Sequence, residues 1–458
     1  MAASYPSGRW PAGPTSAPLG VVARLRLVRQ RARRWQPLEF FPALDIPPGQ
    51  RQGMRMFWLD GVFASICEAF ITPYLTVYLL ALGANAQQVG LFAAAAGLAT
   101  ALAYLPGAYL ADRLPNYRSM VVVSSLAYRG LLLILLALPW LIHGQALITA
   151  VIVLSALRSG FSVLSYPAWA ALCAAIVPES VRGRYFSART LAMSLAALVT
   201  IPLAGRLISS IPVPLGYQIS FGLALVAGLI SSWCYAQIPL LPVAKPARRQ
   251  GFPVWSALKS IPQRPDFARF CVIALTLNLG LQIAAPFFNV YMVRNLGATA
   301  GFVGLATMAS TAADVLGNRT FGPLLDRRGT RWVMLHTLPL LAILPLPWLL
   351  IRQPWQILPI NVAGGFLWAG YNLAIFNLLL LSTPADERPL YSALINTGIA
   401  STALVGPLIG GALYAHWGFG PVIVVTSLAR IITSGLIFLL IRDVRKRPAC
   451  AARASANG

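Results

Sequence analysis

The charged side chains that could do chemistry in this sequence are those that interrupt its long apolar runs. Glu68 lies in the first run and Arg158 in the fourth. If the runs cross a membrane, each residue is about twelve positions from the end of its run that the basic residues place on the cytoplasmic side. At 1.5 Å per residue both would lie about 18 Å deep, where they could pair. A charge at that depth of a bilayer costs several kcal/mol unless it faces a cavity or a partner, so both residues are candidates for a functional site.

Glu68 could bind a proton or a cationic substrate. Desolvation favours the neutral carboxylic acid, whereas a neighbouring arginine favours the carboxylate. A pair with Arg158 that separates and re-forms would therefore serve as a proton relay. The alternative is a permanent structural pair, and the sequence leaves both interpretations open.

Polar side chains on the same and other runs extend this predicted pathway. Glu68 begins a row with Thr72 and Thr76 at i, i+4 and i+8, positions that share one face of a helix. The further pathway candidates are Asn278, Gln282, Asn289, Trp368, Tyr371 and Asn372. Amides and aromatic rings that converge at mid-depth would suit an amphipathic small molecule. The alternative for each of them is an ordinary hydrogen bond between helices.

The overall composition indicates that lipid surrounds much of the chain. The 458 residues include 36 Lys and Arg against 12 Asp and Glu, a net charge of +24, yet only 10% are charged and 57% are apolar. An average soluble domain is about 25% charged and about 45–50% apolar. This balance excludes a disordered basic chain, which requires low hydrophobicity. It also argues against a soluble nucleic-acid binder, whose basic face lies on an ordinarily charged surface.

The cysteines and histidines predict no metal or disulfide chemistry. The five cysteines have no paired spacing, and four of them lie in apolar runs, where cysteine behaves as a small hydrophobic residue. Three scattered histidines complete no metal-binding set, and the sequence has no phosphate-binding loop. We therefore expect no metal, no cofactor and no nucleic-acid partner.

Apolar runs between charge clusters predict twelve membrane-spanning helices of about 20 residues each. Their ranges are 56–80, 88–110, 119–142, 146–170, 186–209, 215–237, 268–292, 301–323, 331–351, 356–381, 390–415 and 420–441. With the N-terminus inside, 29 of the 36 basic residues fall on the inner side. This bias predicts that both termini are cytoplasmic, in what we expect to be a bacterial plasma (inner) membrane. The basic segments would then meet anionic lipid of the inner leaflet.

An internal repeat divides the chain. Gly90 recurs as Gly304 at an offset of 214, and Pro73 recurs as Pro286 at an offset of 213. Two halves in the same orientation, related by an axis along the membrane normal, are one known plan for transporters. The predicted parts are a basic cytoplasmic arm (1–55), an N-terminal six-helix bundle (56–237), a cytoplasmic linker (238–267), a C-terminal six-helix bundle (268–441) and a basic cytoplasmic tail (442–458).

Two loops carry a recognisable motif. GAYLADRLPNYR (107–118) follows the second span and GPLLDRRGTR (322–331) follows the eighth. Both resemble the loop motif of the major facilitator superfamily, which has a glycine, then Leu-x-Asp-Arg, then a glycine and basic residues. Together with twelve spans in two halves, the resemblance covers about residues 55–442. It implies an all-α polytopic membrane protein built as two pseudo-symmetric six-helix bundles.

The motif suits a gate on the cytoplasmic face. An aspartate at a helix end, beside arginines and a tight glycine turn, could hold neighbouring helices through charged hydrogen bonds that break when the inner side opens. The alternative is that these charges only enforce topology. Glu179 would pair with Arg182 in the same layer. Asp386 or Glu387 would pair with Arg388. The predicted gate residues are Asp112, Arg113, Arg118, Gly322, Asp326, Arg327, Arg331, Glu179, Arg182 and Arg388.

The resemblance also sorts the charges within spans. In the resembled family, spans 1, 4, 7 and 10 line a central cavity, and spans 3, 6, 9 and 12 lie outside it. This implies that Glu68 and Arg158 are cavity charges, whereas Arg129 and Arg430 are peripheral or structural. Asp60, near the predicted inner end of the first span, is expected to be a helix-end charge.

These features together predict a monomeric secondary transporter that moves a small organic solute by alternating access, with proton-coupled efflux as one form. The Gly-rich antiporter motif of the family appears in span 5 only as IPLAGR (201–206), which weakens the case for proton antiport. The sugar-porter signature PESPR is missing after span 6, which disfavours hexoses. One alternative is a polytopic glycosyl- or acyltransferase, although the predicted outer loops are short and nearly uncharged. Another is a non-transporting sensor on the same fold.

Overall fold

The structure is a computed structural model that describes residues 48–114, 116–178, 181–239, 261–382 and 388–440. Contacts divide the chain into two units, Met1–Arg51 and Gln52–Gly458. All the geometry below lies in the second unit. Its described residues are helices joined by short turns, and they contain no strand.

Twelve helical segments of the described residues are long and apolar enough to cross a membrane. Each overlaps one predicted span, and the largest difference is at the first, which begins at Gly49 rather than at residue 56. The first six are α2 with α3 (Pro48–Ile71, Leu75–Ala81), α4 (Ala86–Arg113), α5 (Tyr117–Leu141), α6 with α7 (Gly144–Leu164, Tyr166–Ile176), α8 (Arg182–Ser210) and α9 (Leu215–Ala236). The last six are α11 (Pro265–Arg294), α12 (Ala300–Arg328), α13 (Thr330–Ile343) with η2 (Leu346–Leu349), η3 (Pro354–Gln356) with α14 (Ile357–Ser382), α15 (Arg388–Trp417) and α16 (Phe419–Leu440). The predicted fold class is confirmed.

The first span is not one continuous helix. α2 ends at Ile71 and α3 begins at Leu75, and the break contains Pro73, which has no N–H to continue the helical ladder and whose ring disfavours the preceding turn. Thr72 therefore lies in a turn, which corrects the expectation that Thr72 and Thr76 follow Glu68 along one unbroken helix face. The fourth span breaks in the same manner between α6 and α7, next to Pro167.

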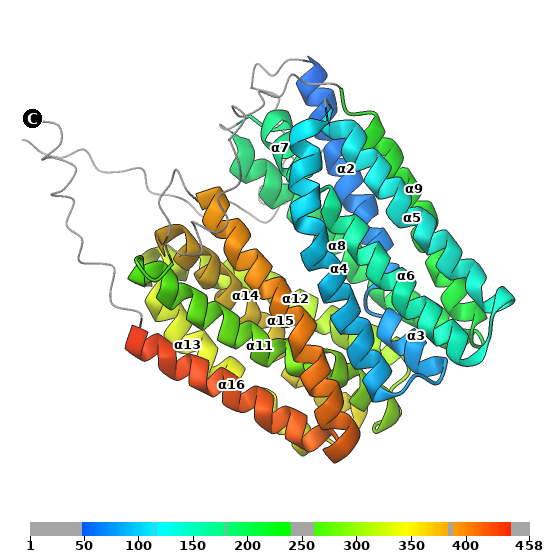
Figure 1. The fold of residues 1–458 in the computed structure, drawn as a ribbon, viewed down its shortest axis with the longest axis vertical. Coiled ribbons are helices and arrows are strands. Elements are labelled where there is room, and N and C mark those ends of the chain that lie inside the picture. Colours follow the sequence, from blue (N-terminus) through cyan, green and yellow to red (C-terminus); the bar gives the residue numbers. More distant parts are fainter. Residues whose placement is uncertain (1–47, 115, 179–180, 240–260, 383–387, 441–458) are drawn as a thin grey trace, which may run out of the picture. The chain divides into compact units, whose positions relative to one another are not determined.

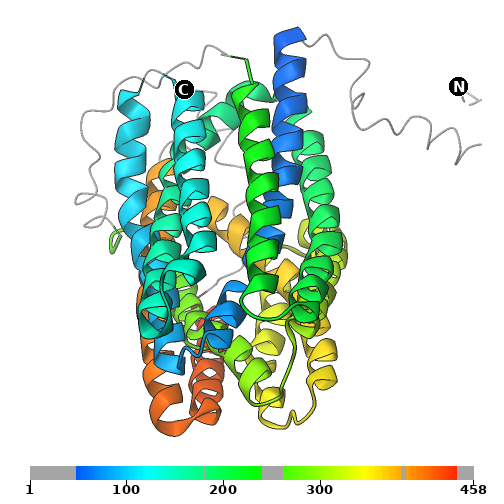
Figure 2. The ribbon, with the colours of Figure 1, turned by 90° about the vertical axis from the view of Figure 1, so that its right-hand side faces the viewer.

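The helices gather into two groups (Figures 1 and 2). Spans one to six, blue to green, lie together, and spans seven to twelve, green to red, form the other group. We call the end that holds Arg113, Arg118 and Arg327 the basic end, and the end that holds Ser209 and Gly297 the opposite end. The predicted boundaries of the two bundles stay predictions, and residues 240–260 of the linker lie outside the described residues.

A shared hydrophobic core joins the two groups at the opposite end. Ile71, Tyr78 and Phe221 of the first half belong to one buried cluster with Phe287 and Val303 of the second. A separate cluster lies within the second half toward the basic end, where Phe267 packs on Tyr391 with ring centroids 4.5 Å apart. The halves are therefore fused by apolar packing at the opposite end.

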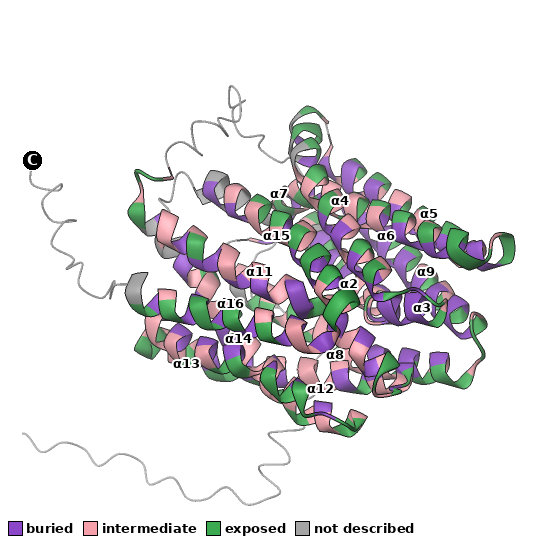
Figure 3. Cartoon of the chain, turned by 60° about the horizontal axis from the view of Figure 1, so that its bottom comes forward, coloured by how far each residue is buried: buried purple, intermediate pink, exposed green. Residues whose placement is uncertain are grey.

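Exposed residues lie along the helices, as the green segments of Figure 3 show, and many of them carry large apolar side chains. Leu102, Val199, Phe376 and Ile432 are among them. Soluble monomers rarely expose contiguous apolar surface of more than a few hundred Å². The exposed faces are those expected of helices that meet lipid, so the chain is a multi-pass integral membrane protein.

Candidate functional site

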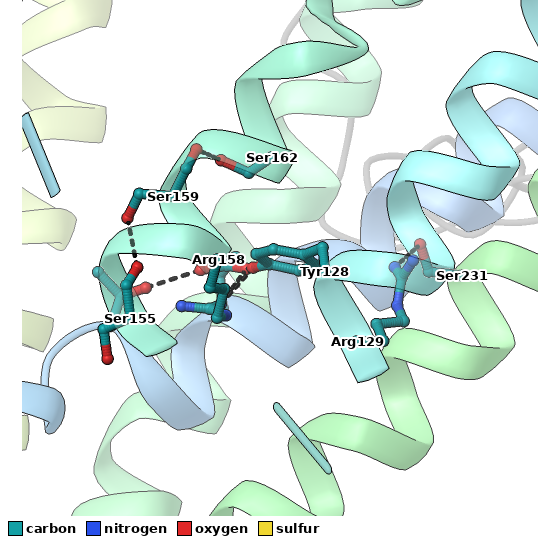
Figure 4. A network of polar contacts seen from close by, with 9 residues as sticks. Tyr128, Arg129, Ser155, Arg158, Ser159, Ser162 and Ser231 are labelled. Atoms are coloured by element: carbon teal, nitrogen blue, oxygen red, sulfur yellow. Dashed lines mark hydrogen bonds and ion pairs between the residues drawn. The ribbon is translucent and has the colours of Figure 1, made fainter. Parts of the chain in front are cut away.

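Four residues form what we call the Glu68 cluster: Glu68, Thr72, Tyr128 and Arg158. Nη2 of Arg158 on α6 lies 2.9 Å from Oε1 of Glu68 on α2. The Thr72 hydroxyl donates to Oε2 of Glu68 over 2.7 Å. The Tyr128 hydroxyl, from α5, donates to the same carboxylate and accepts from Arg158. Figure 4 shows Arg158 and Tyr128 directed toward one another.

The two charged members differ in access to their surroundings. The Arg158 side chain is 8% exposed, and its guanidinium lies 4.3 Å from the centroid of the Tyr128 ring. The Glu68 side chain is 46% exposed, next to the break between α2 and α3. Because one partner is half exposed, the pair contributes little to stability. The arrangement instead holds an accessible carboxylate against a nearly buried arginine.

A second polar network, made of buried side chains, lies in the first half. Asp60 accepts a hydrogen bond of 2.6 Å from Ser231 and lies 3.5 Å from Nη2 of Arg189. Arg129 donates to Ser231 over 3.0 Å and also to Ser232. Figure 4 shows Arg129 beside Ser231. This network ties α2, α5, α8 and α9 together.

The network corrects the expectation for Asp60, which is only 8% exposed. The first helix begins at Pro48, about eight residues earlier than the predicted span, so Asp60 lies well inside it. Its buried carboxylate balances the positive charge of buried arginines. Asp60 is therefore not a helix-end charge. Arg129 has the structural surroundings that the sequence analysis expected.

The pathway candidates of the second half are dispersed. Asn278 donates to the Ala274 carbonyl of its own helix over 2.9 Å, which is a local contact. Tyr371 is buried, its ring centroid 5.3 Å from that of Trp368, whereas Asn372 is exposed and Gln282 is half-buried. Among the hydrogen bonds and ion pairs of the described residues, none joins these side chains to the Glu68 cluster. Asn289 instead lines a cavity within the second half. Convergence on one central site stays a prediction.

The predicted gate residues that the structure describes lie at the basic end. Arg118 donates to the Ile238 carbonyl over 2.7 Å, and Arg182 donates to the Val177 carbonyl over 3.4 Å. Arg113 lies over the Tyr109 ring at 4.2 Å. The remaining described gate residues are Asp326 and Arg327, both exposed, and Gly322 and Arg331, both partly buried. Glu179, Asp386 and Glu387 lie outside the described residues, as do the side chains of Asp112 and Arg388. The gate role is untested.

Hydrogen bonds and glycines bring the halves together at the opposite end. The Gly301 N–H donates to Ser209 over 2.7 Å, and Arg294 donates to the Ala84 carbonyl. A Cβ added at Gly90 would lie 2.8 Å from the Pro407 carbonyl oxygen. Such approaches require residues without side chains.

The repeat contained a signal for these contacts. Gly90 recurs as Gly304, where an added Cβ would meet the Tyr74 hydroxyl and the Ile201 carbonyl. The recurrence of glycine at matched positions therefore marks close helix packing in both halves. Sequence reasoning recorded the repeat but assigned these glycines no role.

Comparison with known proteins agrees with the family resemblance seen in the sequence. The family model described as Major Facilitator Superfamily matches residues 57–288 and 270–456. The Multidrug resistance protein MdtG of Salmonella choleraesuis (strain SC-B67) is 29% identical over 167 residues, which are 35% of this chain and 41% of that protein. The protein of the same name from Salmonella typhi is 28% identical over the same shares. The match thus spans less than half the length of these relatives.

Solved structures match over most of the chain. A mutant of the nucleoside transporter NupG has a TM-score of 0.67 at 12% identity, covering 85% of this chain and 100% of that one. A bacterial homolog to the human lysosomal transporter Spinster, in an inward-facing and unoccupied conformation, has a TM-score of 0.65 at 13% identity, covering 86% and 97%. At these identities the likeness establishes the fold.

Proposed function

Because the chain belongs to the Major Facilitator Superfamily, we propose that it is a secondary active transporter that moves a small organic solute by alternating access, with proton-coupled efflux as its mode. The observation that carries this proposal is the Glu68 cluster. A carboxylate that is 46% exposed, yet paired with a nearly buried arginine, is equipped to exchange a proton without unfolding its surroundings.

The proposed coupling step follows from the contacts of Glu68. When Glu68 takes up a proton its negative charge is lost, so the attraction to Arg158 falls. The Tyr128 hydroxyl can still accept from Arg158, which limits the cost of leaving that guanidinium without its carboxylate. α2 is then free to shift against α6. Because α2 breaks at Pro73 just beyond the cluster, the shift can be confined to part of the first span.

The proposed orientation puts the basic end in the cytoplasm of a bacterial cell. Arginines near span ends favour the inner side, and anionic lipid there would attract them. In this orientation the shared core and the Ser209–Gly301 contact close the outer side. The gate residues of the basic end, with Asp326 as the proposed central one, would close the inner side in the other state.

The proposed substrates are small amphipathic organic molecules. The relatives' name, multidrug resistance protein, favours hydrophobic drugs, and the solved nucleoside transporter adds nucleosides as a second group to examine. A thermal-stability screen of the purified full-length chain with lipophilic cations and nucleosides would select compounds for flux measurements. Flux into proteoliposomes also separates a transporter from a non-transporting sensor.

The Glu68→Gln variant tests the proposed coupling role. Glutamine keeps the shape but cannot carry the transported proton, so solute flux driven by a pH gradient should fall to the background of empty liposomes. Exchange of solute without a gradient should survive, since binding and helix movement do not require net proton transfer. Arg206→Gln, an exposed arginine at the opposite end, serves as the control. Full retention of gradient-driven flux in Glu68→Gln would overturn the role.

A further inference from the structure

The second half holds a buried cation that the proposed transport step does not use. Arg430, near the middle of α16, is only 6% exposed. Its Nη1 donates to the Leu341 carbonyl of α13 over 3.2 Å, and its Nε has no hydrogen-bond partner among the described residues. None of the ion pairs between described residues includes it. A guanidinium buried without an anion is costly, so a completing anion would be strongly stabilising.

The first half shows what completion of a buried arginine looks like. Arg129 joins span 3 to span 6, and Ser231 links it to the carboxylate of Asp60. Arg430 joins the equivalent spans of the second half, 9 and 12, but meets a carbonyl oxygen there. The surroundings of the two arginines therefore differ, because among the described residues no carboxylate forms an ion pair with Arg430 or is linked to it by a hydrogen-bonded serine.

Arg430 lines a cavity of about 230 Å³ within the second half. The lining includes Asn289, Ser310 and Asn361 beside Arg430, with Phe288 and Trp348 as aromatic walls. A cavity of this size has room for more than one water molecule or small ion. A lining that combines a cation and polar groups with aromatic rings describes an amphipathic site.

We propose that this cavity binds a small organic anion, a carboxylate on an aromatic or otherwise apolar body. The carboxylate would accept hydrogen bonds from Arg430 and from the Asn289 amide, and the apolar body would pack against Phe288 and Trp348. The site is additional to the transport centre, because its lining belongs to the second half whereas Glu68 and its partners belong to the first. Its volume exceeds the need of a single inorganic ion.

The test compares benzoate with benzamide, which has nearly the same shape but no charge. Purified full-length protein should bind radiolabelled benzoate saturably at one site and unfold at a higher temperature in its presence. Benzamide should do neither. Equal binding of both compounds would overturn the proposal, as would complete displacement of benzoate by equimolar chloride, which would indicate a plain ion site. Binding of oleate without binding of benzoate would indicate a lipid-derived occupant and would also overturn it.

Variants locate the site. Arg430→Gln should weaken benzoate binding about tenfold or more, whereas Arg430→Lys should lose less because it keeps the charge. Asn289→Ala removes a donor without touching the cation and should weaken binding severalfold, which keeps the test decisive if Arg430→Gln folds poorly. Arg206→Gln is the matched surface control. Glu68→Gln should bind benzoate like the wild type, so failure of the transport proposal would leave this test intact. Unchanged affinity in both cavity variants would contradict the site.

Discussion

Tyr128 bridges Glu68 and Arg158 within the Glu68 cluster. Its hydroxyl donates to the carboxylate and accepts from the guanidinium, and its ring lies 4.3 Å below that guanidinium. A phenol oxygen can donate and accept at once. In the proposed coupling step, the same hydroxyl would stay bonded to Arg158 while Glu68 is neutral.

Replacing Tyr128 by Phe should slow gradient-driven flux about tenfold while solute binding is retained. The loss follows because Arg158 then lacks an acceptor whenever Glu68 is neutral, and an unsatisfied charged donor costs about 1–3 kcal/mol or more. Flux into proteoliposomes and equilibrium solute binding are the two measurements. Tyr235→Phe is the control, since Tyr235 is also buried and its hydroxyl has no partner among the described residues. Equal slowing in both variants would contradict a specific role for Tyr128.

At this scale the sequence identified charges deep in predicted spans, but it missed neutral partners and misjudged charges near predicted span ends. Glu68 and Arg158 were noticed because a charge in an apolar run is rare, and the structure brings them within 2.9 Å. Tyr128 was missed because tyrosine is ordinary in membrane helices and its role depends on how α5 is rotated. Asp60 was misassigned because the helix start was set too late. Its partner Arg189 was overlooked for a similar reason, as it lies close to a predicted span end.

At the scale of elements, two prolines at matching repeat positions have different outcomes. The chain breaks into α2 and α3 at Pro73, whereas α11 runs from Pro265 to Arg294 through Pro286 without a break. Apolar length and composition, which predicted all twelve spans, do not distinguish the two cases. The outcome depends on neighbours. Near the break, Tyr74 donates both its backbone N–H to Ile71 and its hydroxyl to Ile201 of α8. Such tertiary contacts are invisible in the sequence.

The break supplies a prediction about the first span. Pro73→Ala should restore the missing N–H and favour a continuous helix, because proline costs about 3 kcal/mol in a helix interior relative to alanine. We expect gradient-driven flux to fall severalfold, since α3 could no longer move independently of the Glu68 segment, while the unfolding temperature stays the same or rises. Pro286→Ala, in the continuous α11, is the matched control and should alter flux less. A fully active Pro73→Ala protein would show that the break is not needed for transport.

On the scale of the whole molecule, the two halves meet through small residues, both at the opposite end and near the middle of α4 and α15. A Cβ added at Gly97 would lie 2.6 Å from the Ala403 carbonyl, and one added at Gly205 would lie 2.8 Å from that of Ala300. Close backbone approach through small residues is how membrane helices gain packing without a hydrophobic drive between them. The proposed alternating access requires these contacts to separate when the opposite end opens.

The glycine contacts predict how the balance between the two states can be moved. Gly97→Leu should wedge α4 away from Ala403 and favour the state that is open at the opposite end. A cysteine at Ala300, which is buried in this structure, should then react severalfold faster with a membrane-impermeant maleimide in a background without native cysteines. Gly130→Leu is the control, because an added Cβ there meets nothing within 4 Å. Asp326→Asn should shift the balance between the two states the other way, toward the state that is open at the basic end, because it weakens closure there. Equal labelling in Gly97→Leu and Gly130→Leu would mean that the two halves do not separate where α4 meets α15.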